Sequence, residues 1–114
     1  MNNVVLEKSF AFSVRIVRLD KYLTTKKKEY ILSKQLLRSG TSIGANVTEA
    51  QRAQSKADFK SKMSIALKEA YETDYWLKLY YKTEYLNTRE YNSISTDNEE
   101  LISLLIAICK SSSD

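Results

Sequence analysis

The side chains that could do chemistry in this sequence are carboxylates, amines, guanidiniums, hydroxyls and one thiol. Histidine is absent and Cys109 is the only cysteine among 114 residues. The sequence therefore lacks the commonest general base and metal ligand, and one cysteine cannot build a zinc site. Residues 40–44 contain two glycines but lack the lysine and spacing of a phosphate-binding loop. We predict no catalytic residue, no metal and no cofactor, and hence a protein that is not an enzyme.

The remaining candidates for acid–base or metal chemistry are acidic side chains in the middle of the chain: Glu49, Glu69, Glu72 and Asp74. Metal sites built from carboxylates in helical bundles usually include Glu-x-x-His pairs, which this sequence cannot supply. A carboxylate–metal enzyme is therefore the least favoured interpretation. We expect these acids to accept hydrogen bonds from polar neighbours, with Arg38 and Asn46 as candidate donors.

Basic side chains give the strongest functional signal. The formal net charge is +4, but residues 1–68 hold 14 Lys and Arg against 5 Asp and Glu, a net +9, whereas residues 69–114 hold 4 against 9, a net −5. This asymmetry indicates an anionic partner or head-to-tail self-association, and solvated helix faces are the alternative interpretation. The residues predicted to contact nucleic-acid phosphates are Lys8, Arg15, Arg18, Lys27, Lys34 and Arg38.

Apolar periodicity predicts four helices that position these charges, at about residues 9–24, 28–51, 56–86 and 89–110. The chain has no proline and only two glycines, which suits long helices joined by short turns. Ser9 and Ser55 are predicted N-caps of the first and third helices. Four helices with short connections pack most simply as an antiparallel up-and-down bundle. We predict an all-α fold with one domain over residues 1–114.

The middle of the second helix contains residues that favour a turn, at 39–42. Apolar periodicity nevertheless continues in step on both sides of this segment. Gly40 and Gly44 lie four residues apart and share one face of a helix, where they allow another backbone to approach closely. We predict one continuous helix.

The third helix has more apolar surface than a core face requires. Its predicted core face consists of Phe59, Met63, Ala66, Ala70, Leu77 and Tyr81. A second apolar patch lies on nearly the opposite side, and a helix that is apolar on two sides is usually buried on two sides. The residues predicted to form an interface with another subunit are Ile65, Tyr75, Trp76 and Leu79. A tolerated exposed patch and a base-stacking line of tyrosines and lysines are the alternatives.

The predicted location is the cytoplasm, without membrane association. Residues 1–10 do not read as a signal peptide, and one cysteine gives no internal disulfide. The longest apolar stretch, residues 104–109, is far shorter than the roughly 20 residues that span a bilayer.

The segment QLLRSGTSIGANVTEA, residues 35–50, closely resembles the signature of the four-helix bundle family named after the 23S rRNA intervening sequence. Residues 57–59, 62–70, 72–73 and 75–77 are similar to the same family. Many members have proline at the position of Gly44 and glycine at that of Ala50; these departures fit a subgroup of the family, and we expect them to leave the fold intact and at most to alter the end of the second helix. The resemblance implies a four-helix bundle, often a ring-shaped homopentamer, with no established catalytic residues. Some relatives assist a reverse transcriptase and engage nucleic acid.

The leading functional interpretation is a non-enzymatic homo-oligomer that binds RNA or DNA, with structured RNA favoured, through basic helix faces. Such binding is steeply salt-dependent and only weakly sequence-selective. The alternative is a protein-interaction scaffold or accessory factor, for example to a reverse transcriptase, that has no nucleic-acid affinity of its own and recruits a protein partner.

Overall fold

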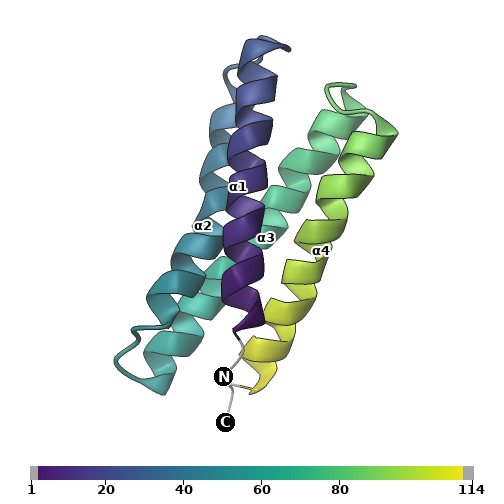
Figure 1. Cartoon of the computed structure of the whole chain (residues 1–114). Helices are drawn as coiled ribbons and strands as arrows, with labels where there is room; N and C mark the ends of the chain where they lie inside the picture. The colour runs from purple at the N-terminus through teal and green to yellow at the C-terminus, as the bar shows by residue number, and fades with distance from the viewer. Residues whose placement is uncertain (1–2, 112–114) are drawn as a thin grey trace.

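The computed structural model describes residues 3–111, which form four helices that run alternately up and down (Figure 1). They are α1 Val4–Thr25, α2 Leu32–Ala50, α3 Lys56–Lys82 and α4 Thr88–Ser111. The α1–α2 and α3–α4 connections lie at one end of the molecule, and the α2–α3 connection lies at the other (Figure 1). The predicted all-α four-helix bundle is confirmed. Positions 1–2 and 112–114 of the predicted domain lie outside the described residues.

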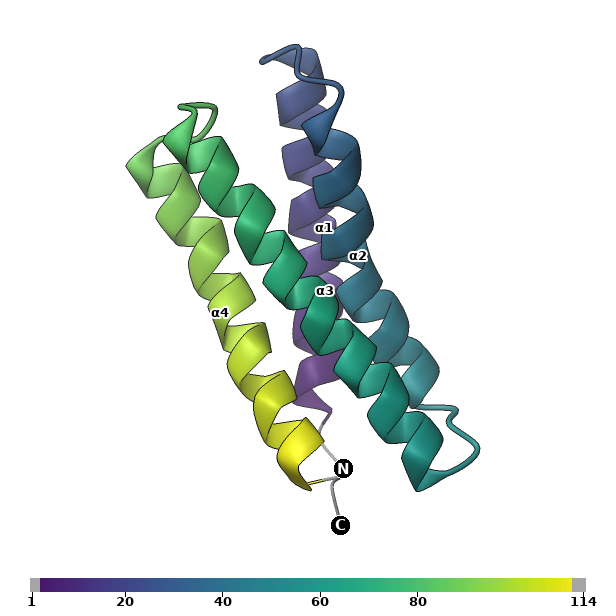
Figure 2. The same cartoon turned by 180° about the vertical axis from the view of Figure 1, so that it is seen from behind.

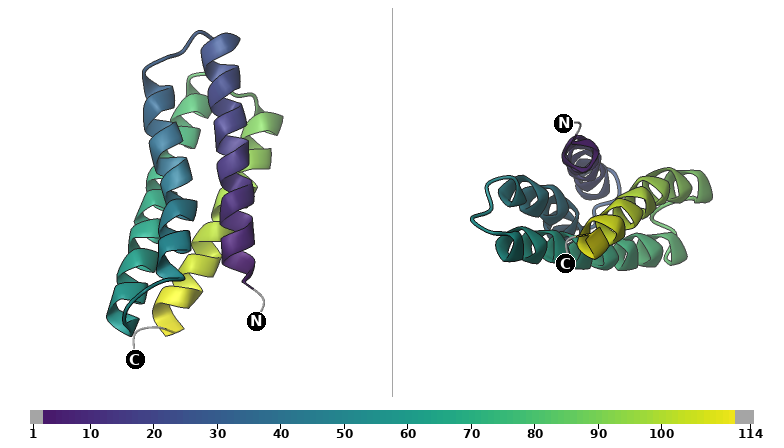
Figure 3. Two further views of the ribbon diagram at one scale, coloured as in Figure 1. Left: turned by 60° about the vertical axis from the view of Figure 1, so that its left-hand side comes forward. Right: turned by 90° about the horizontal axis from the view of Figure 1, so that it is seen from below.

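Packing around the bundle is uneven. Contacts are dense between α2 and α3, α1 and α2, and α3 and α4, and they are sparse between α1 and α4. The two helical hairpins diverge toward the end that holds the α1–α2 and α3–α4 connections (Figures 1 and 2). Viewed along the bundle, α1 and α3 lie across from each other (Figure 3). None of the helices described over residues 3–111 is long and apolar enough to cross a membrane.

Three helix ends differ from the prediction because local hydrogen bonds override apolar periodicity. Helix α1 begins at Val4 rather than 9, since the Asn3 side chain accepts a bond from the Leu6 N–H at 3.3 Å. Ser9 is instead a buried helical residue whose hydroxyl donates to the Leu6 carbonyl oxygen at 3.2 Å. Ser55 caps α3 as predicted, by accepting a bond from the Asp58 N–H at 3.0 Å.

The other two corrections involve residues with positive φ. Helix α2 begins at Leu32 rather than 28, because Lys28 has a φ of 57° and interrupts the chain's helical path. Helix α3 ends at Lys82 rather than 86, because Glu84 has a φ of 70°. The N–H groups of Tyr85 and Leu86 then fold back onto the Tyr80 carbonyl oxygen, a left-handed C-terminal cap.

One core holds the four helices together, and most of its members have the predicted spacing. Its largest fully buried apolar side chains are Phe12, Ile16, Leu23, Leu36, Ile43, Val47, Met63, Leu77, Tyr80, Leu101 and Leu105. The tyrosine of the core is Tyr80, and not Tyr81 as predicted. Tyr81 is half-buried and stacks on Tyr91 of α4, with ring centroids 4.6 Å apart. Phe59 is also only half-buried.

The predicted continuous helix through residues 39–42 is confirmed, and its glycines are where α1 meets α2 most closely. A Cβ at Gly40 would lie 2.7–2.9 Å from three side-chain carbons of Ile16. A Cβ at Gly44 would lie 3.1 Å from both the Ser9 carbonyl oxygen and Ser13 Oγ. Neither glycine has a positive φ. The space at Gly40 therefore favours glycine independently of backbone conformation, whereas a Cβ at Gly44 would make a tight contact that a small shift of its neighbours could relieve.

Replacing Gly40 with alanine is expected to lower the free energy of unfolding. Overpacking costs about 1–3 kcal/mol, which offsets the ~1 kcal/mol that alanine gains in helix propensity. The loss should shrink in part in an Ile16→Val background, because valine lacks Cδ1, one of the three carbons that lie close to the new methyl group. Urea unfolding followed by circular dichroism measures all three variants.

The control is Ala45→Gly on the exposed face of α2, which should cost about 1 kcal/mol through helix propensity alone. A Gly40→Ala variant that is more stable than the parent chain by a similar amount would contradict the tight contact.

Candidate functional site

Three of the six predicted basic residues form ion pairs within the bundle. Lys8 Nζ lies 3.0 Å from Glu100 Oε2, and Arg15 Nη1 lies 2.7 Å from Asp97 Oδ2, so both connect α1 to α4. Arg38 connects α2 to α3 by contacting two acids of α3. These three cations are spread along the bundle and contribute to the packing of helix pairs.

Arg38 bridges two carboxylates of α3. Its guanidinium contacts Glu69 at 3.3 Å and also donates to Glu72. Glu72 accepts a further bond from the Trp76 indole N–H at 3.1 Å. The bonds from Arg38 and then from Trp76 hold the pKa of Glu72 below its ordinary value, while burial opposes them. The predicted role of Arg38 as a partner of the central acids is confirmed.

The other central acids also have structural partners. Glu49 pairs with Lys62, and Asp74 pairs with Lys78, each at 3.0 Å. Asn46 does not contact a carboxylate, contrary to the prediction, because its side-chain amide donates to the Ser42 carbonyl oxygen one turn earlier. Over residues 3–111 no group of three acidic or cysteine side chains is arranged to hold a metal ion.

The remaining three predicted basic residues, Arg18, Lys27 and Lys34, lie at the end of the α1–α2 hairpin. They are joined there by further lysines, and we call the set the basic end: Arg18, Lys21, Lys26, Lys27, Lys28 and Lys34. All six side chains are exposed, and within residues 3–111 none of them forms an ion pair. Between residues 18 and 34 the only acids are Asp20 and Glu29. Six cations against two acids leave a local net charge of +4.

Glu29 fixes the connection that carries these lysines. Its carboxylate accepts bonds from the N–H groups of Ile31, Leu32 and Ser33, all at 2.9 Å, and from the Tyr80 hydroxyl. Burial alone would raise the pKa of Glu29, but the bond from Tyr80 and the three backbone bonds outweigh it and lower the pKa. Burial, followed by the bond to Glu29, raises the pKa of the Tyr80 hydroxyl. Glu29 thus caps α2 and ties the basic end to α3.

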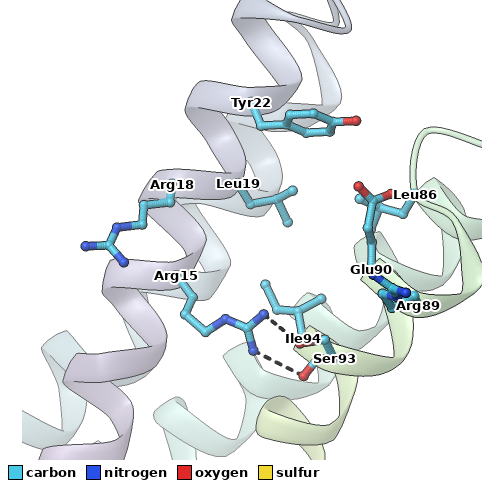
Figure 4. Close-up of a pocket in the computed structure, with 9 residues that line it drawn as sticks. All are labelled: Arg15, Arg18, Leu19, Tyr22, Leu86, Arg89, Glu90, Ser93 and Ile94. Carbon is cyan, nitrogen blue, oxygen red and sulfur yellow. Dashed lines mark hydrogen bonds between the residues drawn. The ribbon is translucent and has the colours of Figure 1, made fainter.

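A cleft of about 500 Å³ lies beside the basic end, between α1 and the start of α4 (Figure 4). Leu19, Leu86 and Ile94 supply its apolar surface. Its polar and aromatic lining consists of Arg15, Arg18, Tyr22, Arg89, Glu90 and Ser93. The sequence indicated only Arg15 and Arg18 as members of a site. The rest of the lining comes from Leu19 and Tyr22 of α1, from α4 and from its preceding turn, and no local pattern predicts that the last two segments face α1.

Tyr22 lines both this cleft and a second hollow of about 370 Å³. The second hollow is lined by Lys27 and by residues of the α3–α4 connection, and it shares Tyr22, Leu86 and Glu90 with the cleft. Lys27 Nζ lies 5.8 Å from the centroid of the Tyr22 ring. The site therefore places an aromatic ring next to the basic end.

The predicted interface residues of α3 are exposed to different degrees. Tyr75 is 59% exposed and Ile65 is 36% exposed, whereas Trp76 and Leu79 are partly buried. Trp76 packs against the core and meets Tyr75 edge-on, with ring centroids 4.9 Å apart. A second apolar patch on α1, Phe10 at 69% and Val17 at 40% exposure, was not predicted. Its residues lie seven apart, a helical spacing that the sequence does contain.

Two comparisons with known proteins extend over nearly the whole chain. The sequence model of the 23S rRNA-intervening sequence protein family matches residues 1–107. The sequence is also 57% identical to that of a protein with unknown function from the S23 ribosomal protein family, from Bacteroides thetaiotaomicron, whose crystal structure is known. That similarity covers 93% of this chain and 98% of the other, with a TM-score of 0.92. A comparison with curated proteins found no match.

Replacing Glu29 with glutamine is expected to lower the free energy of unfolding by about 1 kcal/mol near neutral pH, since it weakens a helix cap. Because the folded pKa of Glu29 lies below the ordinary value of 4.5, its contribution is complete above that pH and is lost as pH falls through the folded pKa. The difference between parent and variant should therefore shrink on acidification. Urea unfolding at a series of pH values measures it.

Glu84→Gln is the control, because Glu84 is exposed and lies in the other connection at the same end. It should leave stability nearly unchanged at every pH. If the loss of stability in the Glu29→Gln variant did not depend on pH, the cap would depend on the shape of the side chain and not on its charge.

Proposed function

This chain belongs to the family of 23S rRNA-intervening sequence proteins, and from that premise and its charge distribution we propose that it is a non-enzymatic homo-oligomer that binds nucleic acid, with structured RNA favoured. The resemblance seen in the sequence is confirmed by both comparisons. The observation that carries the proposal is the basic end, where six exposed cations within residues 18–34 face two acids.

The electrostatics of the basic end favour a polyanion. Each cation that neutralises a phosphate releases condensed counterions, so binding strengthens with the number of such contacts and weakens with salt. The nearby acid Glu29 is already engaged by three backbone N–H groups and by Tyr80, so its charge is directed into the bundle. The lysines extend outward from a connection of fixed geometry, which suits contact with a phosphate backbone.

The shape of the bundle at the basic end favours binding of structured RNA over sequence-specific recognition of DNA. The bundle offers no isolated helix at this end that could enter a major groove, since both hairpins end there in connections (Figure 1). Contacts to phosphates position a protein on a nucleic acid but do not read its sequence. RNA is recognised largely through shape, phosphates and unpaired nucleotides, and these contacts fit the lysines of the basic end and the adjoining cleft.

Self-association is supported by the two apolar patches, Phe10 with Val17 on α1 and Ile65 with Tyr75 on α3. Because α1 and α3 lie across the bundle from each other, the patches face different directions (Figure 3). A head-to-tail contact between two different faces generates rings when the rotation closes. A ring would bring several basic ends into one assembly and multiply the phosphate contacts. The pentamer implied by the family resemblance fits this scheme.

Replacing Arg18, Lys27 and Lys34 together with glutamine is expected to weaken RNA binding about tenfold or more near 0.1 M salt, and to reduce the salt slope by about 2–3, since each phosphate contact contributes roughly 0.7–0.9 to it. Helix content should not change, because these side chains are exposed and form no ion pair within residues 3–111. Fluorescence anisotropy with a labelled RNA hairpin over a range of salt concentrations measures the effect.

The matched control removes the same charge elsewhere, by replacing the exposed residues Lys56, Lys68 and Lys110 with glutamine. It should alter affinity much less. Equal losses in the two variants would mean that overall charge, and not the basic end, determines binding. If the parent chain binds no RNA or DNA even at low salt, the scaffold or accessory role without nucleic-acid affinity replaces this proposal.

Replacing Tyr75 with serine, or Phe10 and Val17 with serine, is expected to weaken self-association about tenfold or more, since loss of a central apolar anchor costs about 2 kcal/mol. Either change should be sufficient, because a head-to-tail contact needs both faces. Light scattering coupled to gel filtration measures the particle mass. Tyr30→Ser, an exposed tyrosine outside both patches, is the control. A parent chain that remains a monomer at high concentration would contradict self-association.

A further inference from the structure

The cleft between α1 and α4 combines an aromatic ring, an apolar lining and three arginines beside the basic end. We propose that this cleft holds one unpaired nucleotide of a bound RNA, with its base against Tyr22 and its phosphate at Arg89. This inference rests on the proposed function and adds to it the part of the RNA that is recognised. The volume of about 500 Å³ lies within the range of small-ligand pockets, which is roughly 300–1,000 Å³.

Tyr22 is placed to stack a base. Its ring extends from α1 toward α4, above the space next to Leu19, and is half-buried (Figure 4). The ring lines both hollows, and Lys27 lies 5.8 Å from its centroid. A lysine near the ring is also near any phosphate attached to a base that stacks there. Stacking on an aromatic side chain tolerates every base, because each base has a π-face.

Arg15 fixes the distance between α1 and α4 at one side of the cleft. Its guanidinium crosses from α1 to α4, where it donates to the Ser93 hydroxyl at 2.9 Å and its carbonyl oxygen at 3.1 Å, and pairs with Asp97 at 2.7 Å (Figure 4). This brace closes the cleft on the side away from the basic end. Because Arg15 is engaged in this way, we assign it a positioning role and not a phosphate contact.

Arg89 is the phosphate contact of the cleft. Its side chain is exposed at the rim on α4, and within residues 3–111 it forms no ion pair. The Arg18 side chain extends from α1 away from α4, so it belongs to the basic end and not to the nucleotide site (Figure 4). Arg89 lies in the first turn of α4, where the helix dipole adds positive potential. A guanidinium suits phosphate through parallel N–H bonds.

Glu90 supplies acceptor oxygens for the edge of the base. One of its oxygens accepts the Asn87 N–H at 2.9 Å, in a capping box completed by the bond from the Glu90 N–H to Asn87 Oδ1 at 2.8 Å. Its carboxylate points into the same space as the Tyr22 hydroxyl (Figure 4). Base amino and imino groups are donors that such a carboxylate can accept. A paired base cannot reach this lining, because its edge is occupied and it stays within the stack.

The test compares an RNA hairpin that contains one bulged nucleotide with the same hairpin fully paired, by anisotropy with the full chain. We expect the bulged RNA to bind about 5- to 100-fold more tightly, the range that one stacked base contributes. Tyr22→Leu should bring this ratio to about one while leaving the affinity for paired RNA unchanged. Tyr22→Phe keeps the π-face and should retain the ratio. Tyr71→Leu, at an exposed tyrosine of α3 outside both the cleft and the basic end, is the matched control and should also retain it.

Each other outcome overturns the inference in a different way. A parent chain that binds both RNAs equally, with steep salt dependence, excludes the nucleotide site but leaves the proposed function in place. A Tyr22→Leu variant that loses affinity for both RNAs equally shows that Tyr22 only supports the fold. A smaller particle mass in that variant shows that the cleft is a contact between subunits. No binding of either RNA by the parent chain overturns the proposed function as well.

Discussion

The close contact between α1 and α2 at Gly40 and Gly44 sets the shape of the molecule. The absence of side chains at these two positions lets Ile16 and the Ser9 carbonyl oxygen approach the α2 backbone. Helix α1 is thereby held against α2, and its distance from α4 is spanned by long side chains. Arg15 and Lys8 reach across to acids of α4. The resulting bundle is tight on one side of α1 and open on the other, and the cleft lies on the open side.

The same arrangement explains the charge asymmetry of the sequence. The basic first part of the chain folds against the acidic second part, so Lys8, Arg15 and Arg38 meet acids of α3 and α4. Much of the complementarity that suggested an external partner is therefore satisfied inside the monomer. The cations of the α1–α2 connection lie beyond the reach of those acids. These cations are exposed to solvent. The proposed binding surface is therefore smaller than a surface made of all six predicted basic residues.

The sequence predicted the number of helices, the continuity of α2 and most of the core, because apolar periodicity and close-packing determine these features directly. It did not predict the helix ends, which depend on single residues such as Asn3 and Glu29 that have no periodic signal. Periodicity predicts Tyr81 rather than Tyr80 as the core residue, because the position of the core face is uncertain by one residue where a helix ends. The bond from Tyr80 to Glu29 decides between them, and it joins α3 to the α1–α2 connection.

The site was less accessible to sequence reasoning than the fold. The neighbouring sequence does not distinguish Arg15 from Arg18. Arg15 contacts α4 whereas Arg18 is exposed, because Asp97 and Ser93 lie opposite only Arg15. Tyr22 and Arg89 belong to segments far apart in the chain, and only the packing of α1 beside α4 brings them to one cleft. The exposed patch of Phe10 and Val17 consists of two apolar residues seven apart, which is too short a pattern to predict a second apolar face.

RNA binding by the basic end and the cleft is tested most directly by a map of the protein residues that crosslink to a photoreactive RNA. A hairpin carrying 4-thiouridine is irradiated with the full chain, and the crosslinked peptides are identified by mass spectrometry. We expect crosslinks concentrated in residues 18–34 and in the turn and first residues of α4 that line the cleft. Crosslinks concentrated at the opposite end, around the α2–α3 connection, or spread evenly over the surface would contradict it.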